Sequence, residues 1–211
     1  MKQKLILIGA GGHCKSCVDV IESTELYEIL GILDLPHLVG TSICGYPIVG
    51  TDADIPKFIK KGVVFLITVG QITHATLRTE LYNKVHKAHG SCATIIAKTA
   101  HVSRSAHIGA NTIIMHNAIV NADAKIGNSC IINTFANIEH DVTIGDVCHI
   151  STGAMVNGGC TIGDASFIGS QSMIAQLVTI PSHTTIGAGS VVLQSISEPG
   201  VYVGNPLKKI R

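Results

Sequence analysis

The sequence predicts two domains: a small parallel α/β domain over residues 1–90 and a β-solenoid of triangular cross-section over residues 91–211. Two observations support this division. Short β-branched segments alternate with helical segments in the first part, and an unbroken six-residue repeat of Ile and Val fills most of the second. Because 46% of the 211 residues are hydrophobic and only 14% are charged, both parts have enough apolar side chains for a core.

The repeat begins at Ile96 and places Ile or Val at every sixth residue through Val192, which makes 17 consecutive positions. A mostly small residue follows four positions after each of them. An α-helix cannot keep this period on one face, because six residues turn it through about 600°. The six-residue period therefore predicts a β-solenoid, in which each repeat forms one side of a coil and points its aliphatic side chain inward. Ile-Gly pairs that recur at every third repeat predict three sides per coil: Ile108-Gly109, Ile126-Gly127, Ile144-Gly145 and Ile162-Gly163.

The first domain is expected to hold buried strands at 4–8, 29–33 and 63–69, with helices after residue 12, around 53–61 and at about 73–88. This alternation predicts a Rossmann-like parallel sheet. Gly11 and Gly12 follow the first strand, where a glycine turn lets backbone N–H groups approach a phosphate at the start of the next helix. Cys14 stands where a dinucleotide fingerprint needs its third glycine, so NAD binding is disfavoured.

Two polar residues near the glycine turn are candidate ligand contacts. Asp34 lies well downstream of Gly12, at the end of the second expected strand, where an acidic side chain can meet a ribose or a base. A residue that caps the loop after the second strand is the alternative for Asp34. His13 stands at the helix start and can face a ligand, with a plain surface histidine as its alternative.

The charge balance and the cysteines exclude several classes of protein. Fifteen basic and 14 acidic residues leave a formal charge of +1, so no nucleic-acid partner is expected. No apolar run reaches the ~18 residues of a membrane span, and the N-terminal run Leu5–Ile8 ends in a glycine turn without a signal-peptide cleavage site. Seven scattered cysteines predict reduced thiols in a cytoplasmic protein. Cys14 and Cys17 lack a second ligand pair, so no metal is expected.

Residues 93–195 resemble the hexapeptide-repeat acyltransferases. The resemblance implies a left-handed parallel β-helix and a homotrimer with active sites in the clefts between neighbouring prisms. The segment Gly9-Ala-Gly-Gly-His-Cys-Lys15, together with Asp34 and Gly70, resembles the sugar acyltransferases of bacillosamine and sialic acid biosynthesis. This branch implies acetyl-CoA as co-substrate and a nucleotide-linked amino sugar held by the first domain at Gly11, Gly12, His13, Asp34, Leu35 and Gly70.

Acyl transfer from a thioester needs a base that deprotonates the acceptor and a donor that stabilises the oxyanion. His140 follows the inward Ile138 by two positions, so it is expected to face outward, and it has carboxylates on both sides, Glu139 and Asp141. The family motif Ile-Glu-His-(Asp/Glu) matches residues 138–141. The resemblance therefore implies His140 as the base and Asp141 in place of a Glu that raises its basicity. Whether Glu139 or Asp141 orients His140 stays open.

The resemblance also implies contacts for the acyl donor. The backbone N–H of Gly158 matches the oxyanion donor. His149 matches a contact of acetyl-CoA, with an exposed solenoid histidine as the alternative. Ser170 and Ala188 match contacts of coenzyme A, although Ser170 departs from the larger aliphatic residue of the family. Lys208 in the basic tail is a candidate phosphate contact, with a solvated terminus as the alternative.

These implications favour an acetyl-CoA-dependent acetyltransferase that acts on the amino group of a nucleotide-linked amino-deoxy sugar in bacterial surface-glycan biosynthesis. An O-acetyltransferase of sialic acid or a related sugar is the nearest alternative, because nothing in the sequence separates nitrogen from oxygen acceptors. A non-catalytic sugar-binding partner of a synthase is a remote one. A zinc lyase of carbonic-anhydrase type is disfavoured, since it needs two histidines at a separation of five, and no two histidines of the solenoid have that separation.

Overall fold

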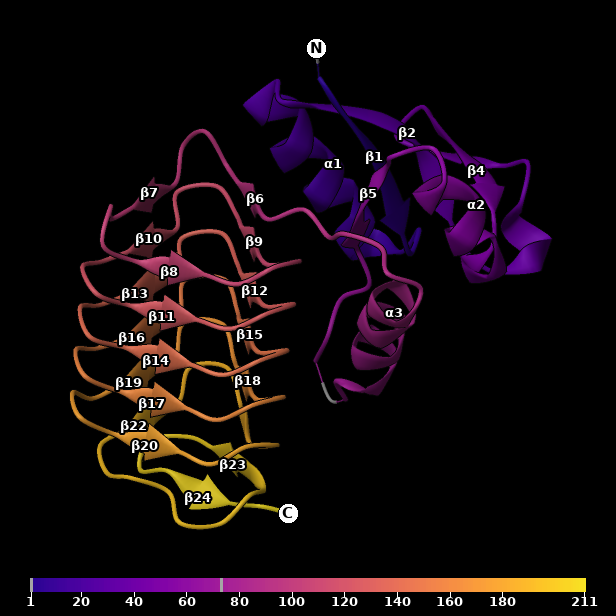
Figure 1. Ribbon diagram of the computed structural model, residues 1–211. Helices are drawn as coiled ribbons and strands as arrows, with labels where there is room; N and C mark the ends of the chain where they lie inside the picture. The colour runs from indigo at the N-terminus through magenta and orange to yellow at the C-terminus, as the bar shows by residue number, and fades with distance from the viewer. Residues whose placement is uncertain (1, 73) are drawn as a thin grey trace.

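A computed structural model describes residues 2–72 and 74–211 of the chain. An α/β domain lies beside the upper coils of a three-sided prism, and the prism continues below it (Figure 1). The four sheets comprise one mostly parallel sheet in the first domain and three stacked sheets of short strands in the second. The predicted fold class, a Rossmann-like domain followed by a left-handed parallel β-helix, is confirmed.

The first domain contains a five-stranded sheet in the order β3-β4-β2-β1-β5, with only β3 antiparallel to its neighbour. Its strands are β1 (Gln3–Ile8), β2 (Tyr27–Leu33), β3 (Ser42–Ile43), β4 (Tyr46–Gly50) and β5 (Val64–Ile67). Its α-helices are α1 (Gly12–Thr24), α2 (Ile55–Ile59) and α3 (Thr76–Lys87), with 3₁₀ turns at Pro36–Leu38 and Asp52–Asp54.

The sequence-based expectations for this domain need three corrections. The β3–β4 hairpin was not predicted, because two-residue β3 is too short to show a periodic pattern. The strand expected at 63–69 ends at Ile67, where the carbonyls of Ile67 and Val69 accept hydrogen bonds from Arg78. The helix expected from about residue 73 begins at Thr76, and Thr73 itself lies outside the described residues.

The prism has three faces, which we number in chain order. The first face holds β6 (Ile95–Ile96), β9 (Ile113–Ile114), β12 (Ile131–Ile132), β15 (His149–Ile150), β18 (Phe167–Ile168), β21 (Thr185–Ile186), β23 (Val201–Val203) and the antiparallel β24 (Lys208–Lys209). The second holds β7 (His101–Val102), β10 (Ile119–Val120), β13 (Asn137–Ile138), β16 (Met155–Val156), β19 (Met173–Ile174) and β22 (Val191–Val192). The third holds β8 (His107–Ile108), β11 (Lys125–Ile126), β14 (Thr143–Ile144), β17 (Thr161–Ile162) and β20 (Thr179–Ile180).

From β9 to β22, the second residue of each short strand belongs to the buried core of the prism. Ile114, Ile132 and Ile150 pair in parallel register, one coil apart, and none of them is exposed. Corner residues in the left-handed backbone region turn the chain from one face to the next, Asp141 (φ 60°) among them. Each sequence position therefore repeats on a vertical line, directly below its counterpart in the preceding coil.

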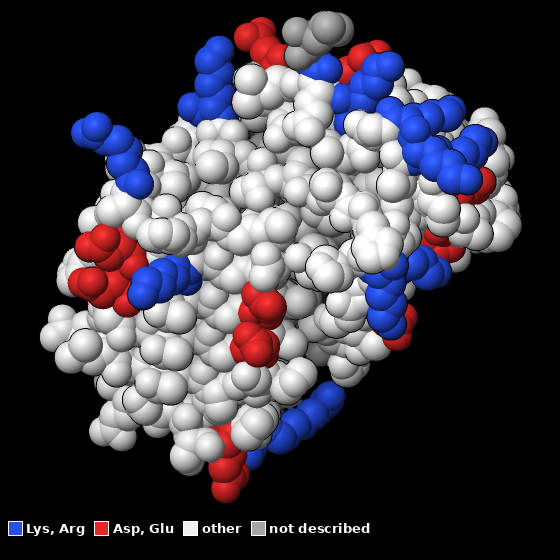
Figure 2. All heavy atoms as spheres, in the orientation of Figure 1, with Lys and Arg blue, Asp and Glu red and all other residues white. Residues whose placement is uncertain are grey.

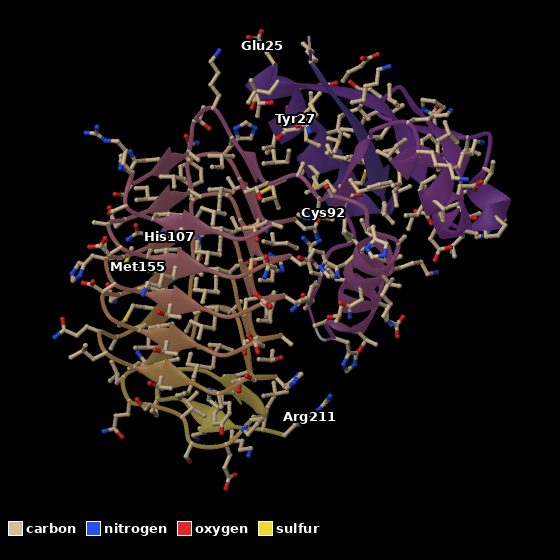
Figure 3. The ribbon with its side chains drawn as sticks, in the orientation of Figure 1. Glu25, Tyr27, Cys92, His107, Met155 and Arg211 are labelled. Atoms are coloured by element: carbon tan, nitrogen blue, oxygen red, sulfur yellow. The ribbon has the colours of Figure 1, made fainter. Side chains whose placement is uncertain are left out.

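The α/β domain docks on the upper part of the first face. The outward side chains of Ile95, Ile113 and Ile131 are fully buried in one cluster with Cys14 and Cys17 of α1. The chain between the domains also extends the first sheet, since the backbone of residues 91–93 pairs with β5. Cys92 lies at this junction (Figure 3). The two domains thus share a continuous apolar contact.

Charged side chains are unevenly spread over the surface. Figure 2 shows Lys and Arg concentrated over the α/β domain, whereas much of the prism surface in view carries no charge. In the described ranges, no helix combines the length and the hydropathy that crossing a lipid bilayer requires.

The inward column makes a direct stability test possible. We expect Ile132→Ala to lower the free energy of unfolding by about 2–5 kcal/mol, because it leaves a cavity in a closely packed column. Thr143→Ala, on the exposed third face, should change it by no more than about 0.5 kcal/mol. Urea titrations at one fixed protein concentration measure both. Equal effects of the two substitutions would contradict the assignment of Ile132 to the core.

Candidate active site

His140 lies at the corner between the second and third faces, two residues after the end of β13. Its Nδ1 lies 2.8 Å from Oδ2 of Asp141, and the imidazole is 64% exposed. Because a carboxylate can only accept, Nδ1 carries the proton in the neutral ring and Nε2 presents a lone pair. This is the tautomer that a general base needs.

The structure distinguishes the two carboxylates beside His140. Glu139 is held away from the ring by two amide donors, since Asn137 Nδ2 donates to its Oε1 (2.9 Å) and Asn121 Nδ2 donates to its Oε2 (3.0 Å). Asp141 therefore orients the imidazole, and Glu139 contributes negative charge nearby. Sequence reasoning missed both asparagines, although Asn121 precedes Glu139 by one full coil.

Gly158 lies one coil below His140. A Cβ at this position would lie 2.8 Å from both Cε1 and Nε2 of the imidazole, so only glycine lets the ring lie across this backbone. The two residues line an open groove of about 740 Å³ together with Asn157, Met173 and Leu177. The pair can act on one small reacting group, with a base on one side and a backbone N–H on the other.

The neighbouring carboxylates raise the pKa of His140. The hydrogen bond to Asp141 is the main cause, because it stabilises the charged imidazolium, and the charges of Asp141 and Glu139 add to it. The pKa of His140 is therefore raised above its ordinary value of 6.5.

A second cavity, of about 870 Å³, opens between the α/β domain and the first face of the prism. The predicted acceptor contacts all line it: Gly11, Gly12, His13, Asp34, Leu35 and Gly70. The N-terminus of α1 faces this space without a side-chain cap, and a Cβ at Gly11 or Gly12 would meet nothing within 4 Å. Exposed N–H groups at a helix start favour a phosphate group.

Asp34 connects the two loops at the rim of this cavity. Its Oδ2 accepts a hydrogen bond from the backbone N–H of Ala10, and its Oδ1 accepts one from Leu35 (2.6 Å). The capping role considered from the sequence is therefore present in the fold. The carboxylate keeps unused lone pairs toward the cavity, so loop capping and ligand contact are compatible.

His149 lines the same cavity from the first face, in β15, and is only 7% exposed. Its Nδ1 donates to the carbonyl of Gln71 (2.5 Å), and its Nε2 accepts from Asn133 Nδ2 (3.0 Å). Its ring packs edge-on against Phe167. The exposed-histidine alternative for His149 is wrong, and sequence reasoning missed Gln71 and Asn133, which fix its tautomer.

Both histidines of this cavity are held neutral. Burial lowers the pKa of His149 to about 4 and that of His13 to about 3, with a smaller contribution from the positive charge of Arg78. The rings lie 6.5 Å apart, centroid to centroid. At neutral pH this cavity therefore offers uncharged imidazoles, in contrast to the exposed and more basic His140.

The predicted coenzyme contacts lie elsewhere on the prism. Ser170 and Ala188 occupy the corner between the first and second faces, and Lys208 lies exposed in β24 at the end of the first face. The hydroxyls of Ser170 and Ser151 are 2.9 Å apart. Within one chain, these residues do not share a cavity with His140. Among residues 2–72 and 74–211, no three His, Cys, Asp or Glu side chains cluster as metal ligands do.

Two family models match the chain. Residues 4–85 match the PglD N-terminal domain, and residues 105–140 and 141–176 match the bacterial transferase hexapeptide repeat. The first domain therefore matches the PglD type and the prism matches the bacterial transferase hexapeptide type, in agreement with the resemblance. A comparison with curated proteins returned no match.

Several solved structures are similar to this chain over nearly its whole length. The acetyltransferase domain of PglB from Neisseria gonorrhoeae FA1090, in complex with acetyl coenzyme A, is 29% identical, with a TM-score of 0.91 over 100% of both chains. PerB from Caulobacter crescentus, in complex with CoA and GDP-perosamine, is 28% identical, with a TM-score of 0.91 over 99% of this chain and 97% of PerB. WeeI from Acinetobacter baumannii AYE is 22% identical and shares the fold, with a TM-score of 0.86 over 99% of this chain and 100% of WeeI.

The assignment of Asp141 can be tested by NMR titration of labelled histidines. We expect Asp141→Asn to lower the pKa of His140, because the amide cannot stabilise the imidazolium as the carboxylate does. Glu139→Gln is the matched control and should lower it less, since Glu139 acts only through its charge. His149 should show no titration above about pH 5 in any variant. A larger effect of Glu139→Gln would reverse the assignment of the two carboxylates.

Proposed function

We propose that this protein transfers the acetyl group of acetyl-CoA to the amino group of a nucleotide-linked amino-deoxy sugar in bacterial surface-glycan biosynthesis. The observation that carries the proposal is a combination of two sites in one chain. At the first, Asp141 orients His140 over the backbone of Gly158. At the second, a separate cavity contains the N-terminus of α1, which has no side-chain cap. The first arrangement suits acyl transfer, and the second suits a diphosphate. All seven cysteines are unpaired, which supports a cytoplasmic location.

In this mechanism the amino nitrogen attacks the thioester carbonyl carbon while Nε2 of His140 accepts the proton that the nitrogen loses. The N–H of Gly158 donates to the oxyanion that forms on the carbonyl oxygen. The tetrahedral intermediate then collapses, the C–S bond breaks, and the thiolate of coenzyme A takes the proton from His140. The products are an amide and free coenzyme A.

The site proposed here needs a second copy of the chain. His140 and Gly158 lie at the corner between the second and third faces, whereas the acceptor cavity opens on the first face. The two cavities share no lining residue. One chain alone therefore separates the base from the bound acceptor.

The second face is the surface that we propose as the contact between copies. Its outward row carries Ile119 and Met155, which are 40% and 43% exposed, and Leu177 at one of its corners is 74% exposed. The third face carries outward threonines instead, such as Thr143 and Thr161. Met155 lies on the side of the prism away from the α/β domain (Figure 3). An apolar row of this kind suits burial against an identical surface.

A threefold arrangement with the second faces toward the axis brings the predicted groups together. In that arrangement the corner that bears His140 meets the corner of the next copy that bears Ser170 and Ala188. The first face of that next copy contributes His149 and the acceptor cavity. A homotrimer with the active sites between subunits thus supplies base, coenzyme contacts and acceptor cavity to each cleft.

The activity is tested by mass spectrometry with acetyl-CoA and a panel of UDP-, GDP- and dTDP-linked amino-deoxy sugars. We expect a product heavier by one acetyl group, with a rate that falls by about 10²–10⁴-fold in His140→Ala because the base is lost. His107→Ala, which removes an exposed histidine of the third face, is the matched control and should keep the wild-type rate. Equal rates in wild type and His140→Ala would remove His140 from the mechanism.

The same assay addresses the alternatives. Acetylation of free sialic acids, with no reaction on amino sugars, would replace the proposal by O-acetylation with the same base. Binding of nucleotide sugars without turnover, unaffected by His140→Ala, would indicate a non-catalytic partner of a synthase.

The shared site makes a further test possible with mixed oligomers. His140→Ala and Asp34→Ala chains should each have low activity alone, since one lacks the base and the other a loop contact of the acceptor cavity. After co-expression we expect about a quarter of the wild-type rate, because one cleft in four then joins an intact base to an intact cavity. Mixed oligomers that are no more active than their parents would contradict a site between subunits.

A further inference from the structure

Arg78 of α3 is a buried cation that joins the two domains. Its Nε donates to the carbonyl of Ser129 (2.7 Å), its Nη1 to those of Ile67 (2.7 Å) and Val69 (2.9 Å), and its Nη2 to that of Asn111 (3.3 Å). The first domain supplies two of these carbonyls at the end of β5. Two successive coils of the prism supply the others, at the corner between the third and first faces. The side chain is 1% exposed.

Backbone carbonyls hold the buried guanidinium of Arg78 in place. In the described part of the chain, no carboxylate pairs with Arg78, so only carbonyl dipoles offset the loss of its hydration. Burial lowers its pKa to about 10, which leaves it charged at neutral pH. An apolar side chain at this position would remove the donor from each of these carbonyls, which costs free energy of folding. Because Val69 also lines the acceptor cavity, the same donors hold part of the wall of that site.

Asn111 strengthens the same junction. Its Oδ1 accepts from the backbone N–H of Ile67 (2.9 Å), and its Nδ2 donates to the hydroxyl of Ser129 (2.7 Å). The end of β5 is thus bonded to the prism through both Arg78 and Asn111. A shift of the α/β domain along the first face would break these bonds together.

The loop that follows β5 connects the Arg78 and Asn111 contacts to the acceptor cavity. Val69, Gly70 and Gln71 line the cavity. The side chain of Gln71 donates to the carbonyl of Val147 (2.8 Å), and its own carbonyl accepts from Nδ1 of His149 (2.5 Å). His13 of the glycine-rich turn packs against Gly70, where a Cβ would lie 3.3 Å from the His13 Cβ. The loop that Arg78 holds therefore contacts both walls of the cavity, His149 on the prism side and His13 on the side of the α/β domain.

We propose that Arg78 is a positioning residue for the acceptor. It fixes the loop at 69–71 against the prism and so sets the separation between the glycine-rich turn and His149. Its positive charge also favours an anionic diphosphate in the adjacent cavity. This inference rests on the function proposed above. The predicted coenzyme contacts at Ser170 and Ala188 lie at the other corner of the first face, and Arg78 reaches the remaining one, His149, only through Gln71, so binding of acetyl-CoA depends less on Arg78 than binding of the acceptor does.

The test compares Arg78→Met and Arg78→Lys with the wild type, and Lys87→Met serves as the matched control on the exposed side of α3. Calorimetry with UDP, GDP and dTDP measures nucleotide binding, and steady-state assays measure KM for both substrates. We expect Arg78→Met to weaken binding of the preferred nucleotide and raise the acceptor KM by about tenfold to a hundredfold. The KM for acetyl-CoA should change less than about twofold, and Arg78→Lys should restore part of the loss.

The outcomes separate this inference from the proposed function. An unchanged acceptor KM in folded Arg78→Met would overturn the positioning role while the acetyltransferase proposal stands. Equal losses for both substrates would also overturn it, since that pattern marks general damage to the fold. If Arg78→Met does not fold, the same criteria apply to Arg78→Lys. A wild-type protein that binds none of the nucleotides would overturn the proposed acceptor class and this inference with it.

Discussion

The structure depends on one constraint, the stacking of chemically matched residues once per coil along the prism. Each inward Ile or Val packs on its counterparts above and below, so a one-residue slip in any coil would turn that coil's aliphatic side chains to solvent. The same register fixes every outward and corner position. His140 therefore lies over Gly158, and Asn121 lies beside Glu139, for the same reason that Ile132 lies over Ile150.

Electrostatic environment gives the histidines of this chain different properties. His140 sits at an exposed corner beside two carboxylates, which favour its protonated form. His149 and His13 sit between two domains, near a buried guanidinium, and burial favours their neutral forms. The fold thus provides a basic imidazole where a proton is to be removed. It provides neutral imidazoles where a ligand is to be held, and Gln71 and Asn133 fix the tautomer of His149.

The sequence predicted those features that depend on residues adjacent in the chain or on the strict six-residue repeat. The prism followed from 17 aliphatic positions, and the pairing of His140 with a carboxylate followed from adjacency. The sequence did not predict which carboxylate, Glu139 or Asp141, orients the imidazole. That depends on the amide donors of Asn137 and Asn121 to Glu139, and Asn121 is one coil away. Arg78 gave no local signal at all. Its four carbonyl partners come from the end of β5 and from two coils, and only the docked domains bring them together.

The corner geometry also accounts for an aspartate at position 141, where the family motif allows Glu. The residue has φ 60°, and Asp tolerates the left-handed region better than a longer acidic side chain does, because its short carboxylate bonds locally. The left-handed turn brings the carboxylate back toward the preceding residue, so the short side chain still reaches Nδ1 of His140 at 2.8 Å. The shorter acid is therefore suited to both the turn and the base. A single residue closes the corner of the prism and orients the imidazole.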